Sequence, residues 1–279
     1  MPSEKRARQR AAREARLAAE AQAAKRRRQI RNAIIVVVVA GAIVGIAFAV
    51  SSSNKPVGNQ SKTSTTLSQA AKTNAHLQAE ANAAAAKAGC PSSPTKPANN
   101  QHYTAAPAMT IDTTKSYSAT VVTTTGTFVI GLNAQAAPKT VNNFVFLADK
   151  GFFHCNSFFR VIPGFVNQTG NPAQTNASST KSGASYTLPA ENLPPAGSAG
   201  KPAYPNGAVA MATSSAGVSG SQFFIVAGAQ GQSLPSSYPL FGLVTSGLNV
   251  VQTINQQGST SGTPPAVTQR ILSITIHES

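Results

Sequence analysis

Acidic side chains are scarce in the second half of this chain of 279 residues. Residues 116–279 contain only Asp149, Glu191 and Glu278, so a pair of carboxylates for general acid–base catalysis is nearly excluded. His154 and His277 have no recognisable partner motif, and the sequence contains no GxSxG, P-loop or GxGxxG motif. An active site in this region would therefore lack a catalytic triad, a carboxylate pair and a phosphate-binding loop.

Arginine is also scarce outside the N-terminal segment. Residues 1–32 hold 11 Lys and Arg residues against 3 Asp and Glu, within a chain whose formal net charge is +15. No aromatic residue lies among these basic residues, whereas nucleic-acid-binding faces usually combine both on a folded surface. We therefore expect a basic cytoplasmic head at residues 1–32 and no nucleic-acid partner. A less favoured alternative is that this head itself binds anionic lipid or nucleic acid.

An apolar run, AIIVVVVAGAIVGIAFAV, occupies residues 33–50 directly after the basic head. As a helix it would span about 27 Å, which is close to the hydrocarbon thickness of a bilayer. Because the basic residues precede it, the positive-inside rule places the N-terminus in the cytoplasm and the chain after Ser51 outside. We expect a single-pass protein of the cell membrane, with residues 33–50 as its transmembrane helix. The alternative is a cleaved signal peptide, because Ala47-Phe48-Ala49 has the shape of a cleavage site.

The chain contains only two cysteines, Cys90 and Cys155. They are too far apart for a CxxC metal motif, and the four histidines show no ligand spacing, so no metal site is expected. On the oxidising outer side of a membrane, cysteines are usually paired. We therefore predict a Cys90–Cys155 disulfide that joins the end of a linker to the folded domain. The alternative is two unrelated cysteines, one of them buried.

Residues 51–115 are predicted to be a tether that gives the folded domain reach from the membrane. Residues 51–66 are rich in Ser, Thr and Asn, which is typical of a flexible linker. Residues 67–88 are rich in alanine with few helix breakers, which favours a helical stalk or a fluctuating helix. Prolines and polar residues in 89–100 end this segment.

From residue 116 the pattern is that of a mainly-β domain. Two β-branched runs within 116–133 flank Thr125-Gly126 and predict a hairpin. Helical spacing of apolar residues predicts one helix over 137–153 and a second over 247–258. Further strands are predicted at 157–162, 164–168, 207–213, 222–227, 240–244 and 270–276. Two helices among about eight short strands predict a closed eight-stranded β-barrel capped by two helices.

Arg160 is the only arginine between Arg31 and Arg270, and it lies in an otherwise apolar stretch, SFFRVIPGFVNQTGN, at residues 157–171. Rotation about an X–Pro bond needs no acid, base, metal or cofactor, because its barrier of about 20 kcal/mol arises from amide resonance. A permanently charged donor aimed at the imide nitrogen would favour the twisted state, in which the nitrogen lone pair is localised, over the planar states. Arg160 beside an apolar slot for the proline ring would meet this need.

The stretch SFFRVIPGFVNQTGN resembles the signature of the cyclophilin-type peptidyl-prolyl cis–trans isomerases. A second block, GAVAMATSSAGVSGSQFFIVA at 207–227, and a third, LPSSYPLFGLV at 234–244, resemble two further family segments. With the hairpin and the helix before them, the resemblance covers roughly residues 116–279. It implies a cyclophilin-like isomerase without a cofactor, whose substrates are proline-containing polypeptides. Together with the expected anchor, it suggests a bacterial, membrane-anchored form that assists the folding of extracytoplasmic proteins.

The resemblance also implies roles for individual residues. Arg160 takes the place of the catalytic arginine, and Gln168 that of the glutamine which contacts substrate and arginine. The remaining assignments to the proline pocket and its walls are Phe165, Met211, Gln222, Phe224, Leu234 and Tyr238. Ala212 and Thr213 match the strand whose backbone pairs with substrate, although the family usually has asparagine where Thr213 stands. Strand alternation is expected to turn Arg160 to the outer groove while Phe158 and Phe159 enter the barrel.

Three departures from the family pattern affect the expected specificity. Thr169-Gly170-Asn171 stands where the family usually has two glycines and an acidic residue, and residues 193–207 replace a glycine-rich loop. The chain has no tryptophan, so tight cyclosporin binding is not expected. A second functional hypothesis is a cyclophilin-like binding or chaperone module with little turnover. The presence of Arg160, Phe165 and Gln168 together favours the enzyme.

Overall fold

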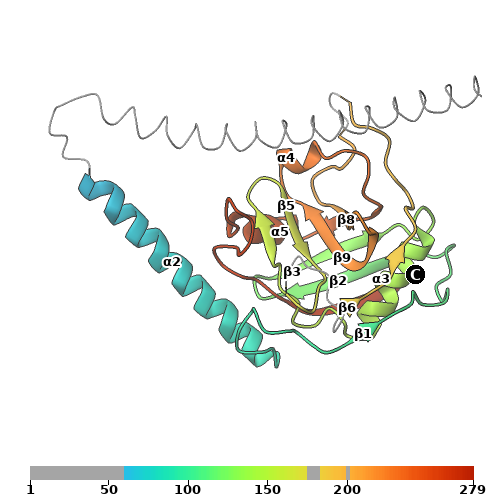
Figure 1. Ribbon diagram of the computed structural model, residues 1–279, viewed down its shortest axis with the longest axis horizontal. Coiled ribbons are helices and arrows are strands. Elements are labelled where there is room, and N and C mark those ends of the chain that lie inside the picture. Colours follow the sequence, from blue (N-terminus) through green and yellow to red (C-terminus); the bar gives the residue numbers. More distant parts are fainter. Residues whose placement is uncertain (1–59, 175–182, 199–201) are drawn as a thin grey trace, which may run out of the picture. The chain divides into compact units, whose positions relative to one another are not determined.

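The structure, a computed structural model, describes residues 60–174, 183–198 and 202–279 (Figure 1). The predicted basic head and transmembrane helix, residues 1–50, lie outside these described residues. Within the described ranges, no helix is both long and apolar enough to cross a membrane. The chain divides into two units, Met1–Ser64 and Thr65–Ser279, and the second contains the folded domain.

The domain is built on one antiparallel sheet of nine strands. The order along the sheet is β11-β2-β3-β10-β8-β9-β5-β4, and the short strand β7 pairs with β9. The strands are β2 (Tyr117–Thr123), β3 (Thr127–Leu132), β4 (Arg160–Ile162), β5 (Val166–Thr169), β7 (Thr187–Leu188), β8 (Ala208–Ser214), β9 (Gly217–Val226), β10 (Leu240–Ser246) and β11 (Ile271–Glu278).

The sheet is an open half-barrel, so the predicted closed eight-stranded barrel is wrong. The hydrogen-bonded path ends at β11 and β4. Near these two ends, residues 155–158 and 269–271 are linked by the isolated bridge Ser157–Arg270 and a few backbone hydrogen bonds, which do not form a ladder. A ladder does not form there because β4 has only three residues and the chain before it turns sharply at Cys155, whose φ is 66°. Such a left-handed backbone angle interrupts an extended strand.

The predicted hairpin over 116–133 is present as β2 and β3. In β2 every second residue is buried, from Tyr117 through Ala119 and Val121 to Thr123, as expected for a strand with one face on a core. Gly126 in the connecting turn has a φ of 152°. A Cβ added at this residue would lie 3.0 Å from a side-chain methyl carbon of Val250. Glycine is therefore the residue that this turn accommodates best.

The two predicted helices are present as α3 (Pro138–Asp149) and α5 (Leu248–Gln256), and a short α4 (Ala229–Gln232) lies between β9 and β10. Pro138 begins α3, where its missing N–H costs nothing. Phe144 of α3 packs against Phe153, Phe223 and Phe241, with ring centroids 5.2–5.6 Å apart. These rings join α3 and one face of the sheet in the main hydrophobic core, to which α5 contributes Val251 and Ile254.

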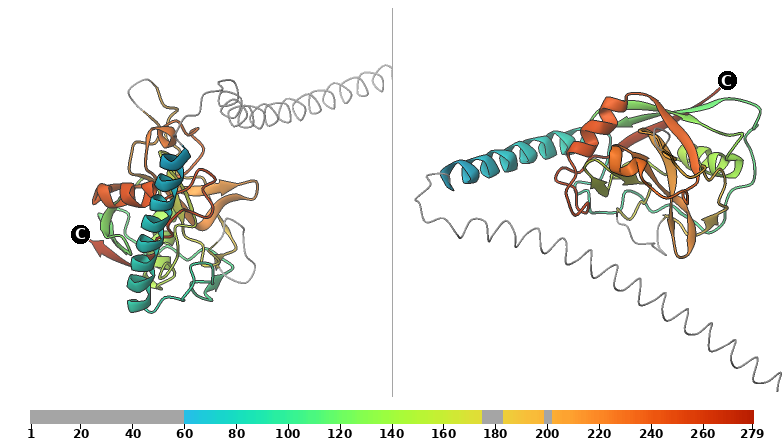
Figure 2. Two further views of the ribbon diagram at one scale, coloured as in Figure 1. Left: turned by 90° about the vertical axis from the view of Figure 1, so that its left-hand side faces the viewer. Right: turned by 90° about the horizontal axis from the view of Figure 1, so that it is seen from above.

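The segment predicted as a tether contains the long helix α2 (Gln60–Lys87), and its C-terminal half packs on the domain. Ala81 and Ala85 are buried, because alanine lets a helix approach its neighbour closely. Gln78 makes two hydrogen bonds to the backbone of Thr268, donating to its carbonyl at 3.3 Å and accepting from its N–H at 2.7 Å. In the right-hand view of Figure 2 the C-terminal end of α2 meets the domain.

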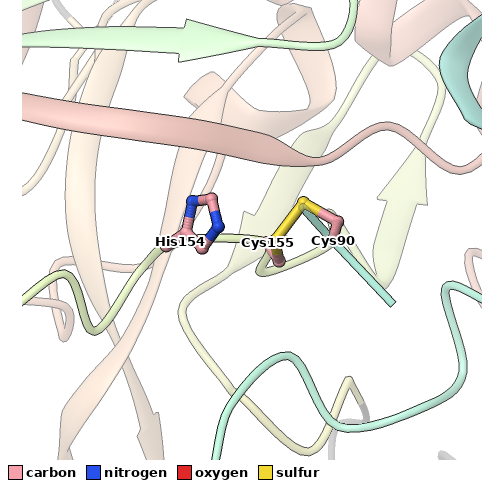
Figure 3. A group of neighbouring side chains, drawn as sticks. All are labelled: Cys90, His154 and Cys155. Carbon is pink, nitrogen blue, oxygen red and sulfur yellow. A yellow bond between two sulfur atoms is a disulfide. The ribbon is translucent and has the colours of Figure 1, made fainter. Parts of the chain in front are cut away.

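Cys90 and Cys155 form a disulfide, which joins the residues after α2 to the loop before β4 (Figure 3). His154 lies beside the disulfide, and its Nδ1 donates a hydrogen bond to the carbonyl of Leu272 at 2.7 Å. Because the two sulfur atoms are bonded to each other and no free cysteine remains, this group is a cross-link and does not offer thiolate ligands to a metal ion.

Arg270, the second arginine of the domain, also helps to attach the residues after α2 to the domain. Its side chain is only 2% exposed, and its guanidinium donates to the carbonyl of Pro91 at 2.6 Å. Burial lowers the pKa of Arg270 from its ordinary value, because a charged group loses hydration there. Residues 78–91 are thus held on the domain by hydrogen bonds, by burial and by a covalent bond.

Replacing both cysteines (Cys90→Ser with Cys155→Ser) should lower the free energy of unfolding by about 4 kcal/mol, because the disulfide closes a loop with a sequence separation of 65 residues in the unfolded chain. Guanidinium unfolding followed by circular dichroism measures this difference. Reducing agent should produce a similar loss in the wild-type chain and none in the double variant. A wild-type unfolding midpoint that does not respond to reduction would contradict the assigned role of the cross-link.

Candidate active site

The candidate site lies on the sheet face opposite the main core. Strand pairing places Arg160 of β4 directly opposite Gln168 of β5, Gln168 opposite Phe224 of β9, and Phe224 opposite Ala210 of β8. Residues directly opposite one another in antiparallel strands point to the same face. Two consecutive strands, β4 and β5, and the later strand β9 therefore bring a guanidinium, an amide and an aromatic ring into one row.

A second, smaller apolar cluster forms the floor of this site. It contains Val166, Phe224 and Val226 from the outer face of β5 and β9, and it is separate from the main core. Phe165, Leu234 and Tyr238 pack against it while remaining partly exposed. Phe224 and Tyr238 make an edge-to-face contact, with ring centroids 5.2 Å apart and an interplanar angle of 87°. The result is a rigid apolar slot that is open to solvent.

The slot is one end of a groove of about 500 Å³. A pocket of this size suits a few residues of an extended peptide or a small molecule. Its far end is formed by two segments, Ala184–Thr187 and Ser214–Ser219, which present mainly hydroxyl groups and backbone. Arg160 carries the only charge among the described residues that line the groove.

Arg160 is held above the slot by two glutamines and an aromatic ring. Its Nη1 donates to Gln168 Oε1 at 3.3 Å, and Gln168 Nε2 donates to Gln222 Oε1 at 3.2 Å. The guanidinium carbon lies 5.8 Å from the centroid of the Phe165 ring, within the range of a cation–π contact. This arrangement orients the guanidinium without neutralising its charge.

No carboxylate pairs with Arg160 among the residues that the structure describes, where the ion pairs are His76–Glu80 and Lys115–Glu278. Partial burial lowers the pKa of Arg160 from its ordinary value, and the proximity of Tyr238 acts weakly in the opposite direction. An arginine nevertheless stays protonated at neutral pH. The site therefore offers a partly desolvated cation that lines the groove.

Nine of the ten residues predicted for the site line the groove, and Met211 does not. Met211 is 2% exposed and packs in the main core, where it pairs with Phe223. Adjacent residues of a strand face opposite sides, so Met211 and Ala212 do not both reach the groove. A register shift between Met211 and Thr213 then allows both Ala212 and Thr213 to line it.

Val166 lines the slot, although it was not among the residues predicted for the site. The sequence contained a signal for it, because Val166 precedes Gln168 by two residues and so shares its face of β5. Phe158 and Phe159 are both buried, as predicted, at 0% and 3% exposure. Their burial leaves Arg160 as the residue of this segment that reaches the groove.

Tyr204 is a positioning residue that the sequence did not reveal. Its ring is fully buried under the slot, and its hydroxyl donates to the carbonyl of Tyr238 and accepts from the N–H of Tyr238, both at 2.8 Å. Burial raises the pKa of Tyr204 above its ordinary value, so the hydroxyl stays protonated and keeps both bonds. Tyr204 thereby fixes the backbone from which the Tyr238 ring projects.

Comparison with known proteins agrees with this geometry. The family model described as "Cyclophilin type peptidyl-prolyl cis-trans isomerase/CLD" matches residues 118–276. Peptidyl-prolyl cis-trans isomerase B of Bacillus subtilis is 40% identical over 125 residues, which cover 44% of this chain and 80% of that protein. Peptidyl-prolyl cis-trans isomerase-like 1 of Aspergillus niger is 34% identical over 158 residues, which cover 56% of this chain and 92% of that protein.

A crystal structure of a cyclophilin-type peptidyl-prolyl cis–trans isomerase from Cryptosporidium parvum aligns with a TM-score of 0.48 at 24% identity, covering 59% of this chain and 99% of that one. The assignment to a family rests on the two preceding findings, namely a family model that matches more than half of the chain and relatives at least 30% identical over most of their length. The chain belongs to the cyclophilin-type peptidyl-prolyl cis–trans isomerase family.

Proposed function

We propose that this chain isomerises X–Pro bonds by holding the proline ring in the slot formed by Phe165, Val166, Phe224 and Leu234, while Arg160 donates a hydrogen bond to the imide nitrogen. The planar imide has no lone pair to offer on nitrogen, because resonance spreads it over the carbonyl. Rotation localises the lone pair, and a donor placed above the nitrogen then gains an acceptor. The interaction exists mainly in the transition state, so it lowers the barrier.

The observation that carries this proposal is the state of Arg160. Its guanidinium is partly desolvated, aligned by Gln168 and Phe165, and has no carboxylate partner among the described residues. An arginine paired with a carboxylate would have fewer N–H groups available to donate to the developing lone pair. An arginine in full solvent would offer the same bond, but water would compete for it.

We propose further that residues 33–50 anchor the chain in the cell membrane, with residues 1–32 in the cytoplasm and the isomerase domain outside. The charge asymmetry around the apolar run supports this orientation. The Cys90–Cys155 disulfide also supports it, because disulfides persist in oxidising compartments. In that location the domain would assist the folding of secreted or cell-wall proteins, for which X–Pro isomerisation is a slow step.

Substitution Arg160→Ala should lower kcat/KM for a proline peptide at least about tenfold, equivalent to about 1.4 kcal/mol of transition-state stabilisation. A protease-coupled isomerase assay measures it. Arg160→Lys is the matched control, because it keeps the charge but loses the planar array of donors, and we expect an intermediate rate. Unchanged Tm values should show that neither substitution unfolds the domain.

Wild-type turnover by Arg160→Ala would contradict the mechanism. If instead the wild-type chain binds proline peptides but does not accelerate their isomerisation, the domain is a binding or chaperone module.

The value of kcat/KM should be flat between about pH 6 and pH 8, because the described residues that line the groove include no His, Asp, Glu or Lys. Activity measured in buffers of constant ionic strength tests this. A bell-shaped profile centred near neutrality would show that a titrating group takes part, and the account of a permanently charged donor would then fail.

Deletion of residues 33–50 should move the chain from the membrane fraction to the soluble fraction, because the apolar run is the proposed anchor. Fractionation and immunoblotting of cells that express each form measure the distribution. The deletion should leave kcat/KM unchanged, since these residues lie outside the domain. A full-length chain found in the soluble fraction would contradict the proposed anchoring.

A further inference from the structure

Part of the chain outside the matched family domain contacts a wall of the groove. The family model begins at residue 118, yet residues 99–103, which we call the strap, run along the domain. The strap contains β1 (His102–Tyr103), which pairs in parallel with β6 (Gly183–Ala184). Figure 1 shows the two strands next to each other. Ala184 and the three residues after it form one wall of the groove's far end.

The strap holds this wall by four hydrogen bonds, one of which runs from Ser185 Oγ to the carbonyl of Tyr103 at 3.4 Å. The N–H of Gly183 donates to the carbonyl of Gln101, and the N–H of Ser185 donates to the carbonyl of Tyr103, each at 2.9 Å. The imidazole Nε2 of His102 lies 2.5 Å from Ser185 Oγ. Ser185 itself lines the groove, so the strap is one residue removed from any peptide bound there.

The strap is fixed in turn to the family domain. The Tyr103 ring packs against Phe146 and Phe152, with centroids 5.3 Å and 6.0 Å apart. The side-chain amide of Gln101 donates to the carbonyl of Lys150 at 3.0 Å. A position fixed on one side by aromatic packing and on the other by backbone pairing is rigid, so the strap can define where the wall stands.

On its opposite side the wall packs tightly against β9. A Cβ added at Gly220 of β9 would lie 2.8 Å from both Ala184 and Tyr186, so the wall already touches the backbone of β9. Tyr186 donates its hydroxyl to Asn143 Oδ1 at 2.5 Å, and burial raises its pKa to about 12. The wall is therefore clamped between β9 and the strap.

We propose that the strap is a specificity element of the isomerase, in that it sets the width of the groove's far end and thereby selects the residue that flanks the proline. This inference rests on the proposed function of the slot. A clamped wall that presents hydroxyl groups and backbone suits small or uncharged polar side chains such as Ala and Ser. It disfavours Trp by size, and it disfavours Lys because Arg160 is the only charged residue among the described lining.

The test uses the full chain and proline peptides that differ only in the residue before proline, which is Ala, Ser, Lys or Trp. Tyr103→Ala removes the ring that fixes the strap, and His102→Ala removes only the bond to Ser185. His76→Ala is the matched control, because His76 lies on α2, is exposed, and pairs through its side chain with Glu80 on the same helix. We expect wild type to prefer Ala over Trp, and Tyr103→Ala to lower that kcat/KM ratio about fivefold. His102→Ala should lower it in the same direction and His76→Ala should not.

Hydrogen exchange at Gly183 and Ser185 provides a readout that does not depend on catalysis. Faster exchange at these amides in Tyr103→Ala, together with the lower ratio, supports the inference. An equal loss of kcat/KM for all four peptides, or an unchanged ratio with faster exchange, overturns it. Failure of the proposed function itself gives a different result, in which Arg160→Ala retains full activity on every peptide.

Discussion

The proposed catalysis depends on one interaction, the hydrogen bond that an uncompensated guanidinium can make to an imide nitrogen only when that nitrogen becomes an acceptor. The sheet order brings Arg160, Gln168 and Phe224 into one row, and the ring of Phe165 removes part of the water around the charge. A carboxylate in the groove would compete for the same donors and cancel the effect. The scarcity of acidic residues in residues 116–279 fits this requirement of the proposed mechanism.

Much of this site could be predicted because chemistry limits which residues can act. A lone arginine in an apolar strand, three ordered motif blocks and strand alternation were enough to predict the row and most of the slot. Strand alternation also explains why Met211 does not line the groove. Its neighbour Ala212 faces the groove, so Met211 points into the main core. Barrel closure was predicted wrongly because it depends on the length of β4 and on the backbone angle at Cys155, which a hydrophobic pattern does not encode.

Contacts made through the backbone were the hardest to predict from the sequence. The strap pairs with β6 over two residues only, and its polar composition predicted a tether. Tyr204 lies in a loop that departs from the family pattern, yet its buried hydroxyl fixes Tyr238. Such long-range contacts of loops and extensions follow from packing in three dimensions, and local periodicity says little about them. They are also where members of one family can differ in specificity without changing the slot.

The most direct test of the central claim is the isomerisation rate of a proline peptide while it is bound, measured by NMR exchange spectroscopy on wild type and Arg160→Ala at saturating protein. We expect the on-enzyme rate to fall at least about tenfold and the dissociation constant of the peptide to change little, because the bond forms mainly in the twisted state. Equal on-enzyme rates in the two proteins, or a loss confined to binding, would contradict it.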